Sequence, residues 1–170
     1  MPPSQSLASS CLVVTNNIKS LQKELSRRIK EVIGMVVSDT QCTFIKGRQI
    51  FNGILNMNEL IHSMKKKERK WGNLIFKLDF SKTYDCVQWD FLEEVLLEMG
   101  FGERCTWWMM ECVTTARATV LVNGSVTNKF RVGKGLRQGD PVSPFLFILV
   151  MKVLHLMLDR AEELGLIGGI

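Results

Sequence analysis

The sequence predicts an α+β fold in which helices pack on a small antiparallel sheet. Three observations lead to this prediction: several long segments carry apolar residues at helical spacing, one short apolar run has strand character, and an Asn-Gly dipeptide joins two extended segments. The expected order is helices, strand, helices, hairpin, helix. This order differs from the regular strand-helix alternation that builds a parallel sheet.

Length and composition fit one globular domain, because the 170 residues are 46% hydrophobic and 23% charged. The net charge of +5 suits a polyanionic partner such as nucleic acid, although a modest lysine surplus also occurs on proteins that bind nothing anionic. The five cysteines are scattered without a CxxC pair, which argues against a zinc knuckle or a disulfide framework. With no secretory signal and no apolar run of membrane length, we expect an intracellular protein without a membrane span.

The N-terminal part is expected to hold a poorly ordered segment, residues 1–15, followed by a helix that begins at Asn16. The opposite face of that helix is basic, and residues 38–50 are expected to form a connection with a short extended piece. The apolar residues of the helix recur at spacings of three and four. They are Ile18, Leu21, Leu25, Ile29, Val32, Ile33 and Val36.

A second helix is predicted over residues 50–66, and it leads into a strongly basic run at 65–70. That run has two interpretations: a solvated helix end, favourable near the negative pole of the helix dipole, or a contact with nucleic acid. The apolar positions of the helix again follow helical spacing, so they are expected to face a core. They are Ile50, Ile54, Met57, Leu60, Ile61 and Met64.

The middle of the chain predicts a strand at 73–80 and two helices, at 91–99 and 103–114. Asp90 and Glu93 have the spacing of a capping box before the first of these helices. Gly100 stands where a helix terminator is expected.

The last third of the chain predicts a hairpin around Asn123-Gly124, because both residue types tolerate positive φ. A glycine-rich loop follows at 133–141. Ser143 as N-cap and Pro144 at the first helical position then predict a helix that continues to about Leu164.

Residues 76–92, FKLDFSKTYDCVQWDFL, contain three aspartates with different interpretations. Asp79 lies at the C-terminal end of an apolar strand, where a carboxylate either binds Mg²⁺ or serves as a helix N-cap or turn residue. Asp90 is best explained as a helix cap, and Asp85 stays open between a metal ligand and a turn residue. Tyr84 either stands over the same pocket as Asp79 or is a core aromatic residue.

The glycine-rich loop GKGLRQGDP lacks the spacing and the ending of a Walker A motif. It combines flexible glycines with cationic and amide side chains just before a helix, which is typical of an anion site but also of ordinary loops. The histidines, His62 and His155, are expected on helix surfaces or in the core. The glycine, cationic and amide residues of the glycine-rich loop are Gly133, Gly135, Gly139, Lys134, Arg137 and Gln138.

Two segments resemble motifs of one known family. FKLDFSKTYDCVQWDFL resembles motif A, and GLRQGDPVSPFLFILVM resembles motif B, of the reverse transcriptases of LINE-type, non-LTR retrotransposons. The segments VVSDTQCTFIKGRQI and LVNGSVTNKF fit the same family in the same order, and the resemblance covers residues 18–170 with a plant-like character. It implies part of a right-hand polymerase, with fingers and an incomplete palm, that makes DNA on an RNA template.

The resemblance assigns roles to individual residues, with RNA template, DNA primer and dNTP as partners and Mg²⁺ as cofactor. Asp79 matches the aspartate that binds the catalytic Mg²⁺ ions, and Phe80 follows it beside the incoming nucleotide. Tyr84 matches the aromatic gate that excludes a ribose 2′-OH. The motif B residues bordering the nucleotide are Arg137, Gln138 and Gly139. The expected nucleic-acid contacts on the fingers side and in the basic run are Arg27, Arg28, Arg48, Lys65, Lys66 and Lys67.

The sequence also departs from the family pattern. It contains no adjacent Asp-Asp pair, which the family carries on a hairpin after motif B, and Thr83 replaces a more usual alanine. The N-terminal stretch LASSCL lacks the Arg and Pro expected there. We therefore expect residues 16–170 to be a partial reverse transcriptase domain without motif C and thumb, inactive by itself. The alternatives are a residual RNA- or DNA-binding module and a non-functional remnant of a retroelement; the oligomeric state is left open.

Overall fold

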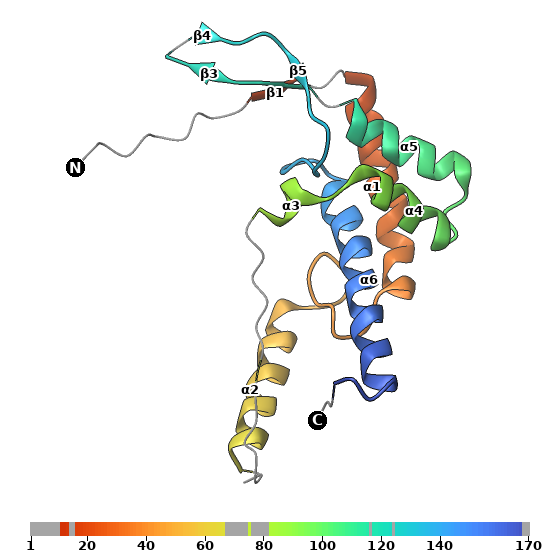
Figure 1. Ribbon diagram of the computed structural model, residues 1–170, viewed down its shortest axis with the longest axis vertical. Coiled ribbons are helices and arrows are strands. Elements are labelled where there is room, and N and C mark those ends of the chain that lie inside the picture. The colour runs from red at the N-terminus through yellow and green to blue at the C-terminus, as the bar shows by residue number, and fades with distance from the viewer. Residues whose placement is uncertain are drawn as a thin grey trace, which may run out of the picture.

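The computed structural model describes residues 11–13, 16–66, 75, 82–115, 117–123 and 125–167. Within them the fold is mixed, with helices and a small antiparallel sheet, as the sequence predicts (Figure 1). The elements in chain order are β1 (Cys11–Val13), α1 (Asn16–Val36), α2 (Ile50–Lys66), α3 (Thr83–Cys86), α4 (Trp89–Glu98), α5 (Glu103–Thr114), β2 (Arg117–Thr119), β3 (Leu121–Val122), β4 (Ser125–Val126), β5 (Phe130–Arg131) and α6 (Ser143–Glu163).

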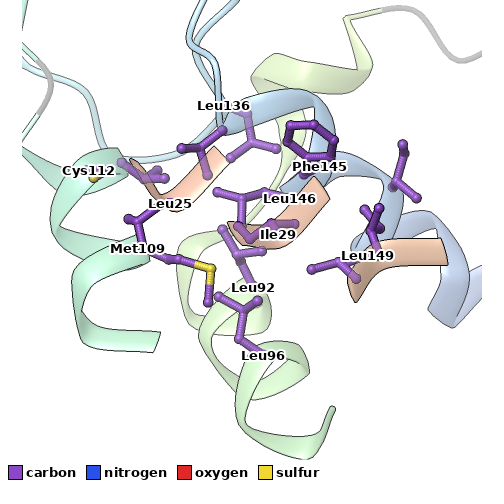
Figure 2. Packing of buried hydrophobic residues seen from close by; sticks show 14 of the residues in the cluster. Leu25, Ile29, Leu92, Leu96, Met109, Cys112, Leu136, Phe145, Leu146 and Leu149 are labelled. Carbon is purple, nitrogen blue, oxygen red and sulfur yellow. The ribbon is translucent and has the colours of Figure 1, made fainter. Parts of the chain in front are cut away.

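One hydrophobic core joins α1, α4, α5 and α6, which lie together in Figure 1. Figure 2 shows side chains from all four helices pointing toward one another, with Leu136 of the glycine-rich loop at the edge of the group. The predicted apolar face of α1 is largely confirmed, although Val32 is 37% exposed. The core residues labelled in Figure 2 are Leu25, Ile29, Leu92, Leu96, Met109, Cys112, Leu136, Phe145, Leu146 and Leu149.

The sheet has the antiparallel strand order β1-β2-β5, so β2 lies between the N-terminal strand β1 and the nearby strand β5. The strand β1 occupies three residues of the segment that the sequence analysis expected to be poorly ordered, because its backbone pairs with β2. The predicted hairpin is confirmed as β3 and β4, with Asn123 at φ 49° in the connecting turn. None of the helices in the described ranges is long and apolar enough to cross a membrane.

The start of α4 differs from the predicted capping box. The helix begins at Trp89, one residue before Asp90, and its N-cap is Gln88, whose side chain makes no capping hydrogen bond. Asp90 therefore lies inside the first turn, where its charge interacts favourably with the helix dipole. The end of α4 agrees with the prediction: Gly100 has φ +81°, and its N–H donates to the carbonyl of Leu97.

The start of α6 is also shifted by one residue. Ser143 is the first helical residue and is buried, whereas Val142 is the N-cap. The prediction that Ser143 caps this helix is wrong, because the carboxylate of Asp140 already accepts the N–H of Val142 at 3.0 Å. Pro144 lies in the first turn as expected, where its missing N–H has no cost.

The helix α2 has the predicted bounds but not the predicted burial. It contains no buried residue, and Ile50 and Ile54 are 60% and 53% exposed. The expectation that its apolar residues face a core is therefore wrong, since α2 projects away from α1 and α6 in Figure 1. Residues 38–49 form turns without a strand, and the strand predicted at 73–80 falls outside the described residues except at Ile75.

Candidate nucleotide site

The short helix α3 is joined to the glycine-rich loop by its backbone. The N–H of Leu136 donates to the carbonyl of Tyr84 at 2.7 Å, and the N–H of Gly135 donates to the carbonyl of Val87 at 2.8 Å. The indole N–H of Trp89 donates to the carbonyl of Gly135 at 2.9 Å. We call this arrangement the 84–89/135–136 joint. It brings together the two segments that resemble motifs A and B, which are about fifty residues apart in the chain.

Glycine is required at position 135 for two reasons. Its φ is +93°, a conformation that side chains disfavour, and an added Cβ would lie 3.0 Å from both the Cα and the carbonyl oxygen of Asp85. Gly139 has a similar φ of +85°, but a Cβ there would meet nothing within 4 Å. The close approach at Gly135 is therefore what lets the loop backbone reach α3.

A pocket of about 610 Å³ opens beside the joint. Arg137 and Gln138 line it, and the exposed Gly139 follows them in the loop. Their contact with a nucleotide stays a prediction. Because the lining contains two cations, Lys134 and Arg137, and one acidic side chain, Asp85, it suits an anionic ligand that also offers an apolar or aromatic part. The remaining lining residues are Trp89, Ala118, Val132, Gly135 and Leu136.

Tyr84 is half-buried and does not belong to the lining of this pocket. Its ring stacks on Phe147 of α6, with ring centroids 4.7 Å apart and an interplanar angle of 20°. Burial raises the pKa of the Tyr84 hydroxyl, so the phenol stays neutral at physiological pH. The stack fixes the ring against α6, whose first part belongs to the segment that resembles motif B, and the predicted role of Tyr84 as a gate stays a prediction.

Two polar residues that the sequence did not mark as site residues connect the glycine-rich loop to α1. Gln22 of α1 and Asp140 are both buried, and the Gln22 amide donates to the Asp140 carboxylate at 2.5 Å. Burial raises the pKa of Asp140, an effect opposed by the Val142 N–H and by the charge of Arg137. A signal for Gln22 was present, because it occupies an inward position of the apolar pattern between Ile18 and Leu25.

The charge on Asp140 also affects a neighbouring thiol. Cys112 of α5 is 3% exposed, and its pKa is raised to about 12, first by burial and then by the negative charges of Asp140 and Glu111. The thiol is therefore neutral at physiological pH and behaves as a core side chain. It offers no nucleophile to the pocket.

The predicted nucleic-acid contacts on α1 are exposed but engaged with acidic neighbours. Arg27 forms ion pairs with Glu24 at 2.8 Å and Glu31 at 3.1 Å, and Arg28 pairs with Glu24 at 2.7 Å. Hydrogen bonds from these two arginines hold the pKa of Glu24 at about 2. Part of their charge is therefore neutralised within the helix, and their contact with nucleic acid stays a prediction.

Arg48 has a structural task in the connection between α1 and α2. Its guanidinium donates to the carbonyls of Ser38 at 2.5 Å and Gln41 at 3.0 Å, and it pairs with Asp39 at 2.9 Å. Only 20% of its side chain is exposed. The contact of Arg48 with nucleic acid stays a prediction. Most N–H donors of the Arg48 guanidinium already bond to residues of this chain. Lys65 and Lys66 are exposed at the end of α2.

The predicted metal ligand Asp79 falls outside the described residues, as do Phe80 and Lys67. Within the described ranges no three His, Cys, Asp or Glu side chains lie close enough together to hold a metal ion. Asp85 is exposed on α3 and lines the pocket, so it stays open between a turn residue and a ligand that needs further carboxylates.

Comparison with known proteins accounts for the pairing of these two segments. Residues 10–167 match the family described as reverse transcriptase (RNA-dependent DNA polymerase). The chain belongs to this family. The match includes the whole 84–89/135–136 joint and the pocket beside it. Divalent metal ions and nucleic-acid template and primer are general requirements of reverse transcriptases.

Two curated relatives of this reverse transcriptase domain come from non-LTR elements. It is 28% identical over 155 residues to the transposon TX1 uncharacterized 149 kDa protein of Xenopus laevis, a match that covers 91% of this chain and 12% of the relative. It is 31% identical over 104 residues to the Pol polyprotein of the type-1 retrotransposable element R2 of Popillia japonica, covering 61% and 14%. An uncharacterized mitochondrial protein of Arabidopsis thaliana is 46% identical over 50 residues, covering 29% and 41%.

The chain thus spans about an eighth of the length of the first relatives. The chain is a reverse transcriptase domain similar to those of LINE-type retrotransposons. The similarity concerns this domain and does not extend to the activities of the full-length relatives.

Proposed function

We propose that this chain supplies the nucleotide-binding part of an RNA-directed DNA polymerase. In this proposal residues 16–170 are fingers and part of a palm, and the pocket beside the 84–89/135–136 joint borders the incoming dNTP. The joint is the observation that carries the proposal. It connects a segment resembling motif A to a loop resembling motif B through two backbone hydrogen bonds and one indole hydrogen bond.

The pocket lining supports a nucleotide as ligand. Lys134 and Arg137 offer positive charge to phosphate groups, and the guanidinium of Arg137 offers several donors in a fixed geometry. Gln138 has both a donor and an acceptor, and its exposed side chain can reach a base or sugar. The aromatic surface of Trp89 supplies an apolar wall. These groups bind and orient the nucleotide.

The proposal assigns metal binding to one residue of this chain. By its resemblance, Asp79 would hold Mg²⁺, which neutralises the triphosphate and lowers the pKa of the primer 3′-OH. The position of Asp79 lies outside the described residues. Two metal ions need further carboxylates, and the sequence contains no Asp-Asp pair.

Nucleotide binding can be measured with a fluorescent dNTP analogue by anisotropy, in buffer with Mg²⁺. We expect the 170-residue protein to bind it, and Arg137→Ala or Gln138→Ala to raise the Kd at least fivefold, because each removes one hydrogen-bonding partner. Gln49→Ala is the matched control, since Gln49 is exposed and lies outside the pocket lining. Equal Kd values for all four proteins would contradict the proposed site.

Primer extension on an RNA template tests the other half of the proposal. We expect these 170 residues to add no nucleotides by themselves, because one aspartate cannot bridge and balance two metal ions. DNA synthesis that depends on Mg²⁺ and is abolished by Asp79→Ala would overturn this expectation. It would show that the remaining ligands come from residues of this chain.

A further inference from the structure

Two arginines lie directly opposite each other on neighbouring strands of the sheet. In the antiparallel register of β2 and β5, Arg117 is the partner of Arg131, and both side chains are exposed. The next pair in the register is Ala118 with Phe130. Because neighbouring residues of a strand point to opposite faces, the two arginines share the face opposite to Ala118, which lines the nucleotide pocket.

This pairing is unfavourable for the isolated fold. Directly opposed residues have Cβ atoms about 4.5–5.5 Å apart, and like charges at that spacing destabilise a sheet. Among the residues that the structure describes, the arginines in ion pairs are those of α1, α6 and the 38–49 connection, and neither Arg117 nor Arg131 is one of them. A further cation, Lys129, is exposed two residues before Arg131. The repulsion is therefore not relieved by an acidic side chain in the described part.

A bound anion would relieve the repulsion between Arg117 and Arg131, and the geometry of the two side chains limits which kind of anion fits. Each guanidinium presents donors in a planar fork that fits the oxygens of a phosphate, and two forks side by side can hold one phosphate or two successive ones. A three-stranded sheet with exposed cations on one face suits an extended chain of phosphodiesters better than a compact anion. A net charge of +5 on the whole chain favours the same class of partner.

We propose that Arg117 and Arg131 form a phosphate-binding pair for the backbone of single-stranded nucleic acid, on the sheet face opposite to the nucleotide pocket. The inference deepens the proposed function and rests on it, since it names where a nucleic-acid strand passes relative to that pocket. The contact is to the backbone, so it is independent of sequence and of the ribose 2′-OH.

The test uses the full 170-residue protein and labelled 20-nucleotide RNA and DNA of the same sequence, with binding measured by anisotropy across a salt series. The Arg117→Gln/Arg131→Gln variant should weaken binding several-fold at low salt. It should also reduce the slope of log K against log[salt] by about 1.4, because single strands release about 0.7 counterions for each phosphate contact. Lys46→Gln/Arg160→Gln, which removes the same charge from exposed positions outside the sheet, should leave the slope nearly unchanged.

Each outcome decides the inference. Equal slopes for the two double variants, or no binding by the wild-type protein, would overturn it. A loss confined to RNA would also overturn it, because a backbone contact must affect DNA alike. The dNTP measurement at Gln138 decides the proposed function separately, so the sheet face can fail while the nucleotide pocket stands.

A charge reversal separates this role from a structural one. Arg131→Glu creates an opposite-charge pair with Arg117, so Tm should rise by about 1–3 °C while nucleic-acid binding weakens. If Tm falls, the two arginines do not repel each other, and the inference loses its basis. If Tm rises and binding is unchanged, the pair does not contact the phosphates.

Discussion

The four helices α1, α4, α5 and α6 share one buried core, whereas α2 has no buried side chain in the described structure. Both α1 and α2 are amphipathic, and both have the helical boundaries that their sequences predict. The difference lies in what each apolar face meets: α1 contacts α5 and α6, and α2 projects from the group (Figure 1). Helical periodicity therefore predicts a helix, while its burial depends on partners that are distant in sequence.

The largest effect is expected in the centre of the core. Leu146 of α6 is 0% exposed, so Leu146→Ala removes buried methyl groups and leaves a cavity among α1, α4 and α6. We expect the free energy of unfolding to fall by about 3–4 kcal/mol. Urea denaturation followed by circular dichroism measures this loss, and a loss below about 1 kcal/mol would mean that the four helices are not tightly packed.

The second prediction concerns the joint that connects the core to the pocket. Gly135→Ala adds a Cβ that meets the backbone of Asp85 in a left-handed conformation, so we expect a loss of about 2–3 kcal/mol. Gly139→Ala is the control, because it has the same backbone strain with open space around the new methyl group. Its expected cost is about 1 kcal/mol. Equal costs would show that α3 and the loop do not touch at Gly135.

The third prediction concerns the buried pair that links α1 to the loop. Asp140→Ala leaves the Gln22 amide and the Val142 N–H without their acceptor, with an expected cost of about 2 kcal/mol. Asp140→Asn keeps an acceptor for Val142 and lets a rotated Gln22 amide accept its new N–H. Its stability at pH 7 should stay within about 1 kcal/mol of the wild type.

The raised pKa of Asp140 gives this pair a pH dependence. The folded state binds the carboxyl proton more tightly than the unfolded state, in which the pKa is near 3.8. Its contribution to stability is therefore fully present below pH 3.8 and is lost as pH rises through the raised pKa. In unfolding curves collected across this range, Asp140→Asn should remove that part of the slope, and an identical slope in both proteins would contradict the burial of the charge.

The smallest effect is expected on α2. Ile54 is 53% exposed, so Ile54→Ala loses little burial and gains some helix propensity. The free energy of unfolding should change by less than about 0.5 kcal/mol, as for other surface substitutions. A cost above about 2 kcal/mol would show that α2 packs its apolar face, and the contrast with Leu146 would disappear.

Sequence alone predicts much of this fold because local signals mark the ends of its elements. The apolar spacing from Ile18 to Val36 predicts α1, Gly100 ends α4, and Asn123-Gly124 turns the hairpin. The two capping predictions failed for different reasons. At α4 the indole N–H of Trp89 donates to the carbonyl of Gly135, a bond between residues distant in sequence. At α6 the bond is local, because the Val142 N–H donates to the carboxylate of Asp140 two residues earlier.

The candidate site was predicted in part. Arg137 and Gln138 were identified from their loop and lie on the pocket, whereas the link to Gln22 and the stack of Tyr84 on Phe147 needed three-dimensional structure. Both involve pairs separated by more than sixty residues, and no local pattern encodes such distances. The polar side chain of Gln22 at an inward position was nevertheless a readable signal for a buried partner.

Photo-cross-linking with an azido-dATP analogue, followed by mass spectrometry of the labelled peptides, tests the central claim most directly. The account predicts label on peptides that contain residues 82–89 or 133–140, and unmodified dATP should compete for it. Label confined to α1 or α2, or label that excess dATP does not reduce, would contradict a nucleotide site at the 84–89/135–136 joint.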